Sequence, residues 1–114
     1  MTTIYHNPRC SKSRATLELI KESGTSADIV LYLDNPPSAK TLKSITQMLN
    51  CSINEIVRKG EDIYRELNLA DKKLSEDELI NIVVANPKLL ERPIVVNDGK
   101  AIIGRPPENV LTIL

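Results

Sequence analysis

Residues 2–33 read TTIYHNPRCSKSRATLELIKESGTSADIVLYL and predict a strand, a helix and a second strand in succession. The first strand, residues 2–5, is rich in β-branched and aromatic side chains and runs into a proline-containing loop. Residues 11–23 place apolar side chains at helical spacing before Gly24, which favours a helix end. Residues 29–33 form a continuous apolar run, which predicts a strand buried on both faces. The three elements make a βαβ unit of about thirty residues.

The middle of the chain is typical of helices. A Pro-Pro-Ser step at residues 36–38 breaks the chain and offers an N-cap, after which apolar residues recur at helical spacing. Ser52 with Glu55, and Ser75 with Glu78, each match the capping box, in which two side chains satisfy free N–H groups of a helix start. We therefore expect a helix after each pair, and an Asn-Pro step ends the second one.

The last part of the chain changes character again. Two β-branched runs, residues 94–96 and 101–103, flank an Asp-Gly step that is typical of a hairpin. A Pro-Pro step at 106–107 suits the first turn of a closing helix. The order β-α-β, helical insert, β-β-α predicts an α/β protein with a thioredoxin-like fold, in which helices flank a central mixed β-sheet. We expect one domain over residues 1–114.

Composition argues against several classes of protein. Fifteen basic and fifteen acidic side chains cancel, and no dense Lys/Arg run is present, so we expect no nucleic-acid or membrane partner. The sequence has no Cys/His pair at metal-ligand spacing, no P-loop and no dinucleotide-binding glycine motif, so we expect no metal and no nucleotide cofactor. No signal peptide is visible, and two cysteines are few for a disulfide-stabilised secreted domain. These features favour a cytoplasmic protein.

Cys10 lies between the end of the first predicted strand and the start of the first predicted helix. A thiolate at this place meets the positive end of the helix dipole, free N–H groups and nearby cations, all of which favour the ionised, nucleophilic form. The alternative is a buried free cysteine without chemistry. The polar, basic loop around it favours a reactive thiol, so Cys10 is our candidate nucleophile.

The neighbours of Cys10 limit how it can be used. Ser13 occupies the second position of a Cys-x-x-Cys pair, so turnover needs a thiol from another molecule. Ser13 itself either donates a hydrogen bond to the Cys10 sulfur or only satisfies the helix start. His6 is either a base or cation beside Cys10 or a surface residue. Cys51 adjoins a capping box, and we interpret it as structural.

Three arginines lie at predicted element boundaries: Arg58, Arg92 and Arg105. A guanidinium group binds a tetrahedral oxyanion through two hydrogen bonds at once, which Lys cannot do. Each of these boundary arginines is alternatively a solvated surface charge, and spacing alone does not show that they converge. They are our candidates for holding an oxyanion substrate.

Several short motifs follow one another along the chain. They are Ile4-Tyr5-His6-Asn7-Pro8-x-Cys10-x-x-Ser13-Arg14, Leu31-Tyr32-Leu33-x-x-Pro36-Pro37, Arg58-Lys59, Leu67-x-Leu69-Ala70, Arg92-Pro93-Ile94-Val95-Val96 and Arg105-Pro106. In this order they resemble the glutaredoxin-coupled arsenate reductase family, over nearly the whole chain. The basic loop around Cys10, and a chain that stops at Leu114 without a C-terminal extension, resemble a chromosomal subgroup of that family.

The resemblance implies a thioredoxin-like fold with a helical insert and a cis peptide bond before Pro93. It further implies that Cys10 attacks arsenate while the boundary arginines hold the oxyanion, that His6 tunes the thiol and that Ser13 hydrogen-bonds it. Arsenate or a related oxyanion is the implied substrate. Glutathione, as a reducing co-substrate, and glutaredoxin are the implied external reductants, and no bound cofactor is implied.

Two other functions fit part of the sequence. A glutathione-linked thiol oxidoreductase acting on another substrate accounts for Cys10 and for the missing second cysteine, but it leaves the boundary arginines without a task. A redox-responsive regulator that binds RNA polymerase is the other, and such regulators commonly carry Cys-x-x-Cys, whose second position is Ser13 here. The arginines favour the reductase over both.

Overall fold

The two ends of the chain fold together, and the segment between them forms a unit of its own. The computed structural model describes all 114 residues. Unit 1 comprises Met1–Asn35 and Arg92–Leu114, and unit 2 comprises Pro36–Glu91. The helical insert predicted from the sequence thus corresponds to unit 2.

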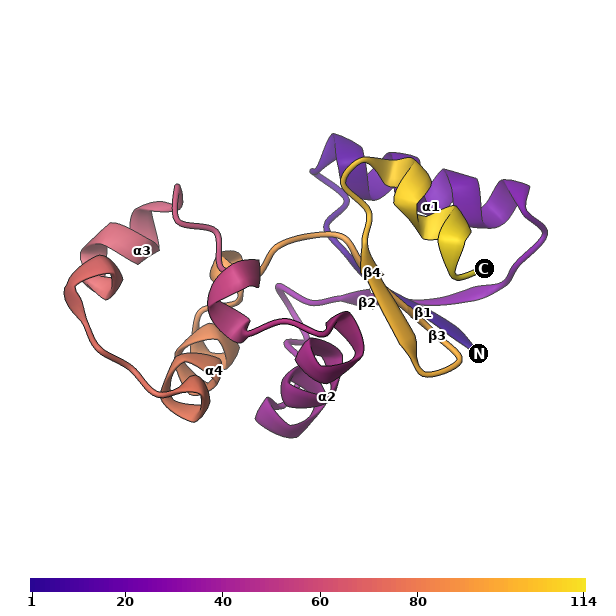
Figure 1. Cartoon of the computed structure of the whole chain (residues 1–114). Helices are drawn as coiled ribbons and strands as arrows, with labels where there is room; N and C mark the ends of the chain where they lie inside the picture. The colour runs from indigo at the N-terminus through magenta and orange to yellow at the C-terminus, as the bar shows by residue number, and fades with distance from the viewer. The chain divides into compact units, whose positions relative to one another are not determined.

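Unit 1 is built on a mixed sheet of four strands in the order β2-β1-β3-β4 (Figure 1). The central strand β1 (Thr2–His6) pairs in parallel with β2 (Ala27–Leu31) and antiparallel with β3 (Ile94–Asn97). β3 in turn pairs antiparallel with β4 (Lys100–Ile103). Because β1 lies between β2 and β3, residues from both ends of the chain share one sheet.

Two helices cover one face of this sheet. α1 (Ser11–Glu22) connects β1 to β2, and the 3₁₀ helix η4 (Pro107–Thr112) follows β4 and packs beside α1 (Figure 1). The core between sheet and helices consists of buried aliphatic side chains: Ile4, Ile20, Val95 and Val110. Burial of such a side chain stabilises a fold by about 1.5–3 kcal/mol. The sheet and its helices confirm the predicted α/β, thioredoxin-like fold.

The second strand differs from its prediction in both position and burial. β2 begins at Ala27, which pairs with Thr2, and it ends at Leu31, before the apolar run is complete. Ile29, Leu31 and Leu33 expose 47%, 40% and 38% of their surface, so the prediction of a strand buried on both faces is wrong. The reason is the sheet order, because β2 is an edge strand with a neighbour on one side only. A continuous apolar run indicates burial only when neighbouring elements cover it.

The hairpin and the closing helix lie where the sequence places them. Asp98 and Gly99 have φ values of 53° and 74°, the left-handed conformation that a two-residue hairpin turn requires. The Pro-Pro step starts the closing helix as predicted, with Pro107 in its first turn. This helix, η4, is six residues long and of the 3₁₀ type, which is used for short helical pieces.

Unit 2 is helical. Its elements are α2 (Ala39–Leu49), η1 (Ile53–Ile56), α3 (Asp62–Glu66), η2 (Leu69–Asp71), α4 (Glu76–Ala85) and η3 (Pro87–Leu89). Both predicted capping boxes are present, and the one at Ser75 starts α4 as expected. The box at Ser52 starts only the four-residue η1, so a capping box marks a helix start without determining helix length. None of the helices in the chain has the length and apolar character needed to cross a membrane.

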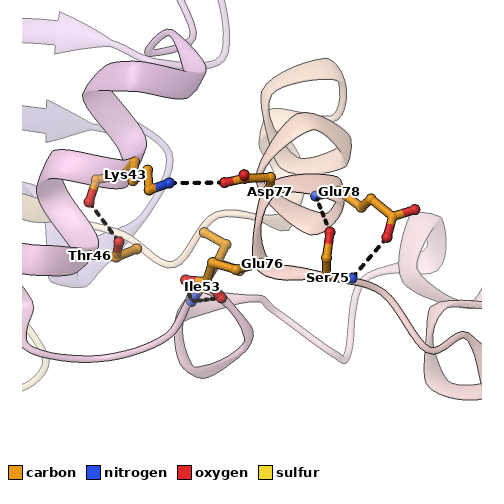
Figure 2. Close-up of polar contacts among 7 residues, drawn as sticks. All are labelled: Lys43, Thr46, Ile53, Ser75, Glu76, Asp77 and Glu78. Atoms are coloured by element: carbon orange, nitrogen blue, oxygen red, sulfur yellow. Dashed lines mark hydrogen bonds and ion pairs between the residues drawn. The ribbon is translucent and has the colours of Figure 1, made fainter.

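Three carboxylates in the first turn of α4 make polar contacts with three different parts of unit 2 (Figure 2). Glu78 completes the capping box with Ser75. Glu76 accepts a hydrogen bond from the backbone N–H of Ile53 at 2.9 Å and thereby caps η1 from outside. Asp77 pairs with Lys43 of α2, with 3.2 Å between Nζ and Oδ1. Negative charge at a helix N-terminus is favoured by the helix dipole, so the same carboxylates also stabilise α4 itself.

Candidate active site

The loop between β1 and α1 presents Cys10 at the start of a helix. Cys10 is the N-cap residue of α1, with extended backbone angles (φ −93°, ψ 123°). Its N–H donates to the carbonyl oxygen of Asn7 at 3.0 Å, and the side-chain oxygen of Asn7 accepts from the N–H of Arg9 at 3.0 Å. One turn into the helix, Arg14 donates from Nη1 to the carbonyl oxygen of Pro8 at 2.9 Å. These bonds hold the loop, so the half-buried Cys10 side chain has a defined position.

The surroundings of Cys10 stabilise its thiolate. Burial alone would raise the pKa of this thiol, but the backbone N–H of Ser13, the guanidinium of Arg92 and the N–H of Lys12 outweigh burial and lower the pKa. Arg105 adds a further contact, from Nη1 to the Cys10 sulfur at 3.8 Å. Because the thiolate is the nucleophilic form of cysteine, the lowered pKa favours the form of Cys10 that a nucleophile requires.

Arg92 and Arg105 reach Cys10 from two loops at the same end of the sheet. Arg92 precedes β3 and Arg105 follows β4, so the antiparallel hairpin brings the two residues together. Nη1 of Arg105 also donates to the carbonyl oxygen of Arg92 at 3.3 Å. The Arg92–Pro93 peptide bond is cis, as the resemblance implies, and so is Arg105–Pro106, which the sequence did not predict. Two guanidinium groups beside one thiolate form a site suited to a tetrahedral oxyanion.

Arg58 belongs to unit 2, where two carboxylates hold its guanidinium. Nη1 lies 2.7 Å from Glu91 and Nε lies 3.3 Å from Glu61. Burial alone would lower the pKa of Arg58, but Glu91 and then Glu61 outweigh it and raise the pKa. Arg58 is therefore ion-paired and partly buried, which differs from the fully solvated surface charge that was its alternative interpretation. Its convergence with Arg92 and Arg105 stays a prediction.

His6 and Ser13 form a buried hydrogen-bonded pair. His6 Nδ1 and Ser13 Oγ are 2.6 Å apart, and the same Oγ accepts from the N–H of Asn7 at 3.0 Å. The hydroxyl of Ser13 thus bonds to His6 and Asn7, while its backbone N–H is the group that acts on the Cys10 sulfur. His6 exposes only 6% of its surface, so the interpretation of His6 as a surface residue is wrong.

The surroundings of His6 disfavour its protonated form. Burial is the largest cause that lowers its pKa, and the positive charges of Arg14 and Lys21 lower it further. A cation at His6 would thus be unfavourable beside these groups. Of the two roles considered for His6, the structure favours a hydrogen-bonding partner that orients Ser13. It does not favour a positive charge that stabilises the thiolate.

Sequence reasoning missed Gly104, which directly precedes Arg105. A Cβ atom on Gly104 would lie 2.3 Å from Thr16 Oγ1 and 2.8 Å from Pro93 Cγ, far inside normal contact distance. The N–H of Gly104 donates to the carbonyl oxygen of Pro93 at 3.0 Å. The missing side chain therefore lets the Arg105 loop pack tightly against α1 and against the loop of Arg92. A glycine between a strand and an arginine is the only trace of this in the sequence.

Cys51, the second cysteine, differs from Cys10 in its electrostatics. Burial and the negative charges of Glu55 and Glu76 raise the pKa of its thiol. Cys51 and Cys10 are both free cysteines. Nowhere in the chain do three or more His, Cys, Asp or Glu side chains gather in a way that could hold a metal ion.

Known proteins resemble this chain over nearly its whole length. The model of the ArsC family matches residues 5–113. The Escherichia coli K12 protein named uncharacterized protein YfgD is 59% identical over 97% of this chain and 94% of its own length. An arsenate reductase of Neisseria meningitidis serogroup A is 47% identical over 97% of this chain and 96% of its own length. The structure of the arsenate reductase from Vibrio cholerae matches with a TM-score of 0.95 at 47% identity, over 99% of this chain and 97% of that one.

Proposed function

Since the chain belongs to the ArsC family, we propose that it reduces arsenate to arsenite, with Cys10 as the nucleophile and glutathione and glutaredoxin as external reductants. One observation carries this proposal: the thiol of Cys10 has a lowered pKa and is contacted by Arg92 and Arg105. The arsenate reductases among its relatives support arsenate as the oxyanion. The reaction takes place in the cytoplasm, where glutathione and glutaredoxin keep thiols reduced.

Substrate binding has to overcome charge repulsion. Two like unit charges about 4 Å apart repel by about 4 kcal/mol at an effective dielectric constant of about 20. A thiolate and an arsenate anion therefore approach each other only among cations. Arg92 and Arg105 supply two guanidinium groups next to the sulfur. Arg58 is proposed as a third ligand of the oxyanion on the resemblance of its Arg-Lys motif.

The proposed cycle balances in atoms and electrons. The Cys10 sulfur bonds to arsenic and one arsenate oxygen leaves as water; the glutathione sulfur then bonds to arsenic and a second oxygen leaves as water. The thiolate of glutaredoxin attacks the glutathione sulfur, so the electron pair of the sulfur–arsenic bond passes to arsenic and reduces it from the +5 to the +3 state. Water releases arsenite from Cys10. One mixed disulfide of glutaredoxin and glutathione forms for each arsenite.

His6 and Ser13 are proposed as positioning residues in this cycle. Their hydrogen bond fixes the first turn of α1, whose N–H groups act on the Cys10 sulfur. A neutral imidazole can keep the hydrogen bond to Ser13. The thiolate is then stabilised by the N–H groups and by Arg92, and not by a charge on His6.

The direct test is arsenite formation by purified protein supplied with arsenate, glutathione and glutaredoxin. We expect turnover by the wild-type protein and by Cys51→Ser, and none by Cys10→Ser. Thioredoxin alone should support little turnover, because Cys10 has no resolving cysteine at the second position of a Cys-x-x-Cys pair. Loss of turnover in Cys51→Ser, with the fold intact by circular dichroism, would show that Cys51 resolves Cys10 and that the proposed role of glutathione is wrong.

A further inference from the structure

A groove runs beside the Cys10 loop and is not used by the oxyanion. Residues 6–9 of the loop line one side of it, and Leu31, Leu33 and Asp34 at the end of β2 line the other. Its volume is about 360 Å³, within the range of sites for small molecules. We call this site the edge groove. Arg92 and Arg105 do not line it, so it is separate from the guanidinium groups that contact the Cys10 sulfur.

The edge groove combines apolar, charged and backbone groups in one place. Leu31 and Leu33 expose 40% and 38% of their surface there, which the apolar run of β2 did not predict. Arg9 and Asp34, both exposed, supply a cation on the loop side and an anion on the strand side. β2 is an edge strand, so the backbone groups on its outer side have no neighbouring strand. Together these features suit a short extended peptide with charges of both signs.

We propose that the edge groove binds glutathione. This inference rests on the proposed function, because only arsenic bound to Cys10 requires a second thiol. Glutathione has a carboxylate at its glycine end, both an ammonium group and an α-carboxylate at its γ-glutamyl end, and two amide bonds between the ends. In the proposed orientation the α-carboxylate points to solvent, away from Asp34. The glycine carboxylate pairs with Arg9, the ammonium group pairs with Asp34, and the apolar stem of the cysteine lies on Leu31 and Leu33.

Arg9 connects the edge groove to the loop that carries Cys10. Arg9 is the residue before Cys10, and a tripeptide spans roughly 10 Å when extended. In this proposal, glutathione held at Arg9 and Asp34 presents its thiol to arsenic on Cys10, the next residue of the same loop. Glutathione pairs with Arg9 and the oxyanion with Arg92 and Arg105, so the two substrates bind through different cations.

The kinetic test compares the two substrates. We expect Arg9→Gln and Asp34→Asn each to raise the KM for glutathione about two- to fivefold, the range for charge pairs at an open site, and to leave the KM for arsenate unchanged. Arg65→Gln and Asp28→Asn are the matched controls, since both residues are exposed and lie outside the groove. Unchanged KM for glutathione in both groove variants would overturn the assignment.

Glutathione derivatives identify which charge meets which residue. The glutathione glycine monoethyl ester should have a raised KM with the wild-type protein and no further rise with Arg9→Gln, because both changes remove the same contact. N-acetylglutathione should behave in the same way toward Asp34→Asn. Additive effects in both pairs would contradict the proposed orientation.

A binding experiment separates this proposal from the proposed function. S-methylglutathione has no free thiol, so its binding by calorimetry does not depend on arsenate turnover. We expect it to bind the wild-type protein and the control variants, and to bind Arg9→Gln and Asp34→Asn several-fold more weakly. Equal binding to all proteins, or no binding to the wild type, would overturn the edge groove as a glutathione site. Absence of arsenite formation, with binding as expected, would overturn the proposed function alone.

Discussion

At the scale of single residues, the two cysteines show how position controls thiol chemistry. Burial raises the pKa of both thiols, but N–H groups and Arg92 reverse this effect at Cys10, whereas Glu55 and Glu76 reinforce it at Cys51. The thiols differ because one lies at a helix start among cations and the other lies among carboxylates. Their reactivities should differ accordingly.

The first prediction concerns alkylation of these thiols. Near neutral pH, iodoacetamide should modify Cys10 faster than Cys51, because a larger share of Cys10 is thiolate. Arg92→Ala should raise the pKa of Cys10 and slow its alkylation, while Arg65→Ala should not. Peptide mass spectrometry against time and pH measures both rates. Equal rates at the two cysteines would refute a depressed pKa at Cys10.

The second prediction concerns His6, the only histidine in the chain. Its pKa is lowered in the folded protein, so between the folded and unfolded pKa values the unfolded chain binds more protons. The stability that His6 contributes is therefore complete above the unfolded value, about 6.5, and is lost as the pH falls through the folded value. Urea unfolding from about pH 7.5 to about pH 5 should show a steeper loss of stability for the wild type than for His6→Gln. Parallel curves would contradict a neutral His6.

The third prediction concerns Gly104. Gly104→Ala should lower the free energy of unfolding by about 1–3 kcal/mol, because its Cβ atom would overlap Thr16 and Pro93. The cost should shrink in a Thr16→Ala background, where the nearest clashing atom is removed. Gly60→Ala is the control, since a Cβ there meets nothing within 4 Å. Equal urea midpoints for the Gly104 and Gly60 variants would show that the close approach is not required.

At the scale of elements, unit 2 is stabilised both by contacts between neighbouring residues and by contacts between residues far apart in the chain. The capping box of Ser75 and Glu78 spans three positions and starts α4 as predicted. The bond between Glu76 and Ile53 spans 23 positions, and no sequence pattern indicated it (Figure 2). Neighbouring carboxylates of one helical turn thus have different functions.

The fourth prediction uses two of these neighbours as a matched pair. Glu76→Ala should lower the free energy of unfolding by about 1–2 kcal/mol, because it leaves the half-buried N–H of Ile53 without its carboxylate. Asp77→Ala should cost at most about 1 kcal/mol, because the side chains of Lys43 and Asp77 are 54% and 73% exposed. Urea denaturation of both variants measures the difference. A larger loss of stability for Asp77→Ala than for Glu76→Ala would contradict the prediction that the Glu76 contact contributes more than the Asp77 ion pair.

At the scale of the whole molecule, the fifth prediction concerns the boundary arginines. Changing Arg58, Arg92 or Arg105 to Ala should each lower kcat/KM for arsenate about tenfold to a hundredfold, the loss of a charge-assisted contact of about 1.5–3 kcal/mol. Lys at each position should restore only part of this activity, since a point charge lacks the two-bond fit. Arg65→Ala, an exposed arginine paired with Asp62, is the control.

The three arginines test different claims in this experiment. If only the Arg58→Ala variant has normal turnover, Arg58 has a structural role in its ion pairs with Glu61 and Glu91 and does not hold the oxyanion. Near-normal turnover in all three Ala variants would remove the basis for an oxyanion site beside Cys10. Circular dichroism shows in each case whether the variant is folded.

The sequence predicted features that depend on a few neighbouring residues. The Asp-Gly turn and the capping box of Ser75 are local, and both are present. Burial of β2 depends on which strands become its neighbours, so its prediction was wrong. The ion pair of Arg58 with Glu91 and the close approach of Gly104 to Thr16 link residues far apart in the chain. No local pattern encodes such contacts, and they determine much of the site's geometry.

The pairing of β1 with β3 makes the order of synthesis matter. Ile4 faces Val95 across the sheet, about ninety positions later in the chain, so this pairing closes a long loop and is expected to form slowly. Arg92, which lowers the pKa of Cys10, also belongs to the late segment. The ribosome thus releases Cys10 long before Arg92 has been made. On the growing chain the Cys10 thiol lacks the contribution of Arg92, and its pKa is fully lowered only when the last fifth of the protein has joined the sheet.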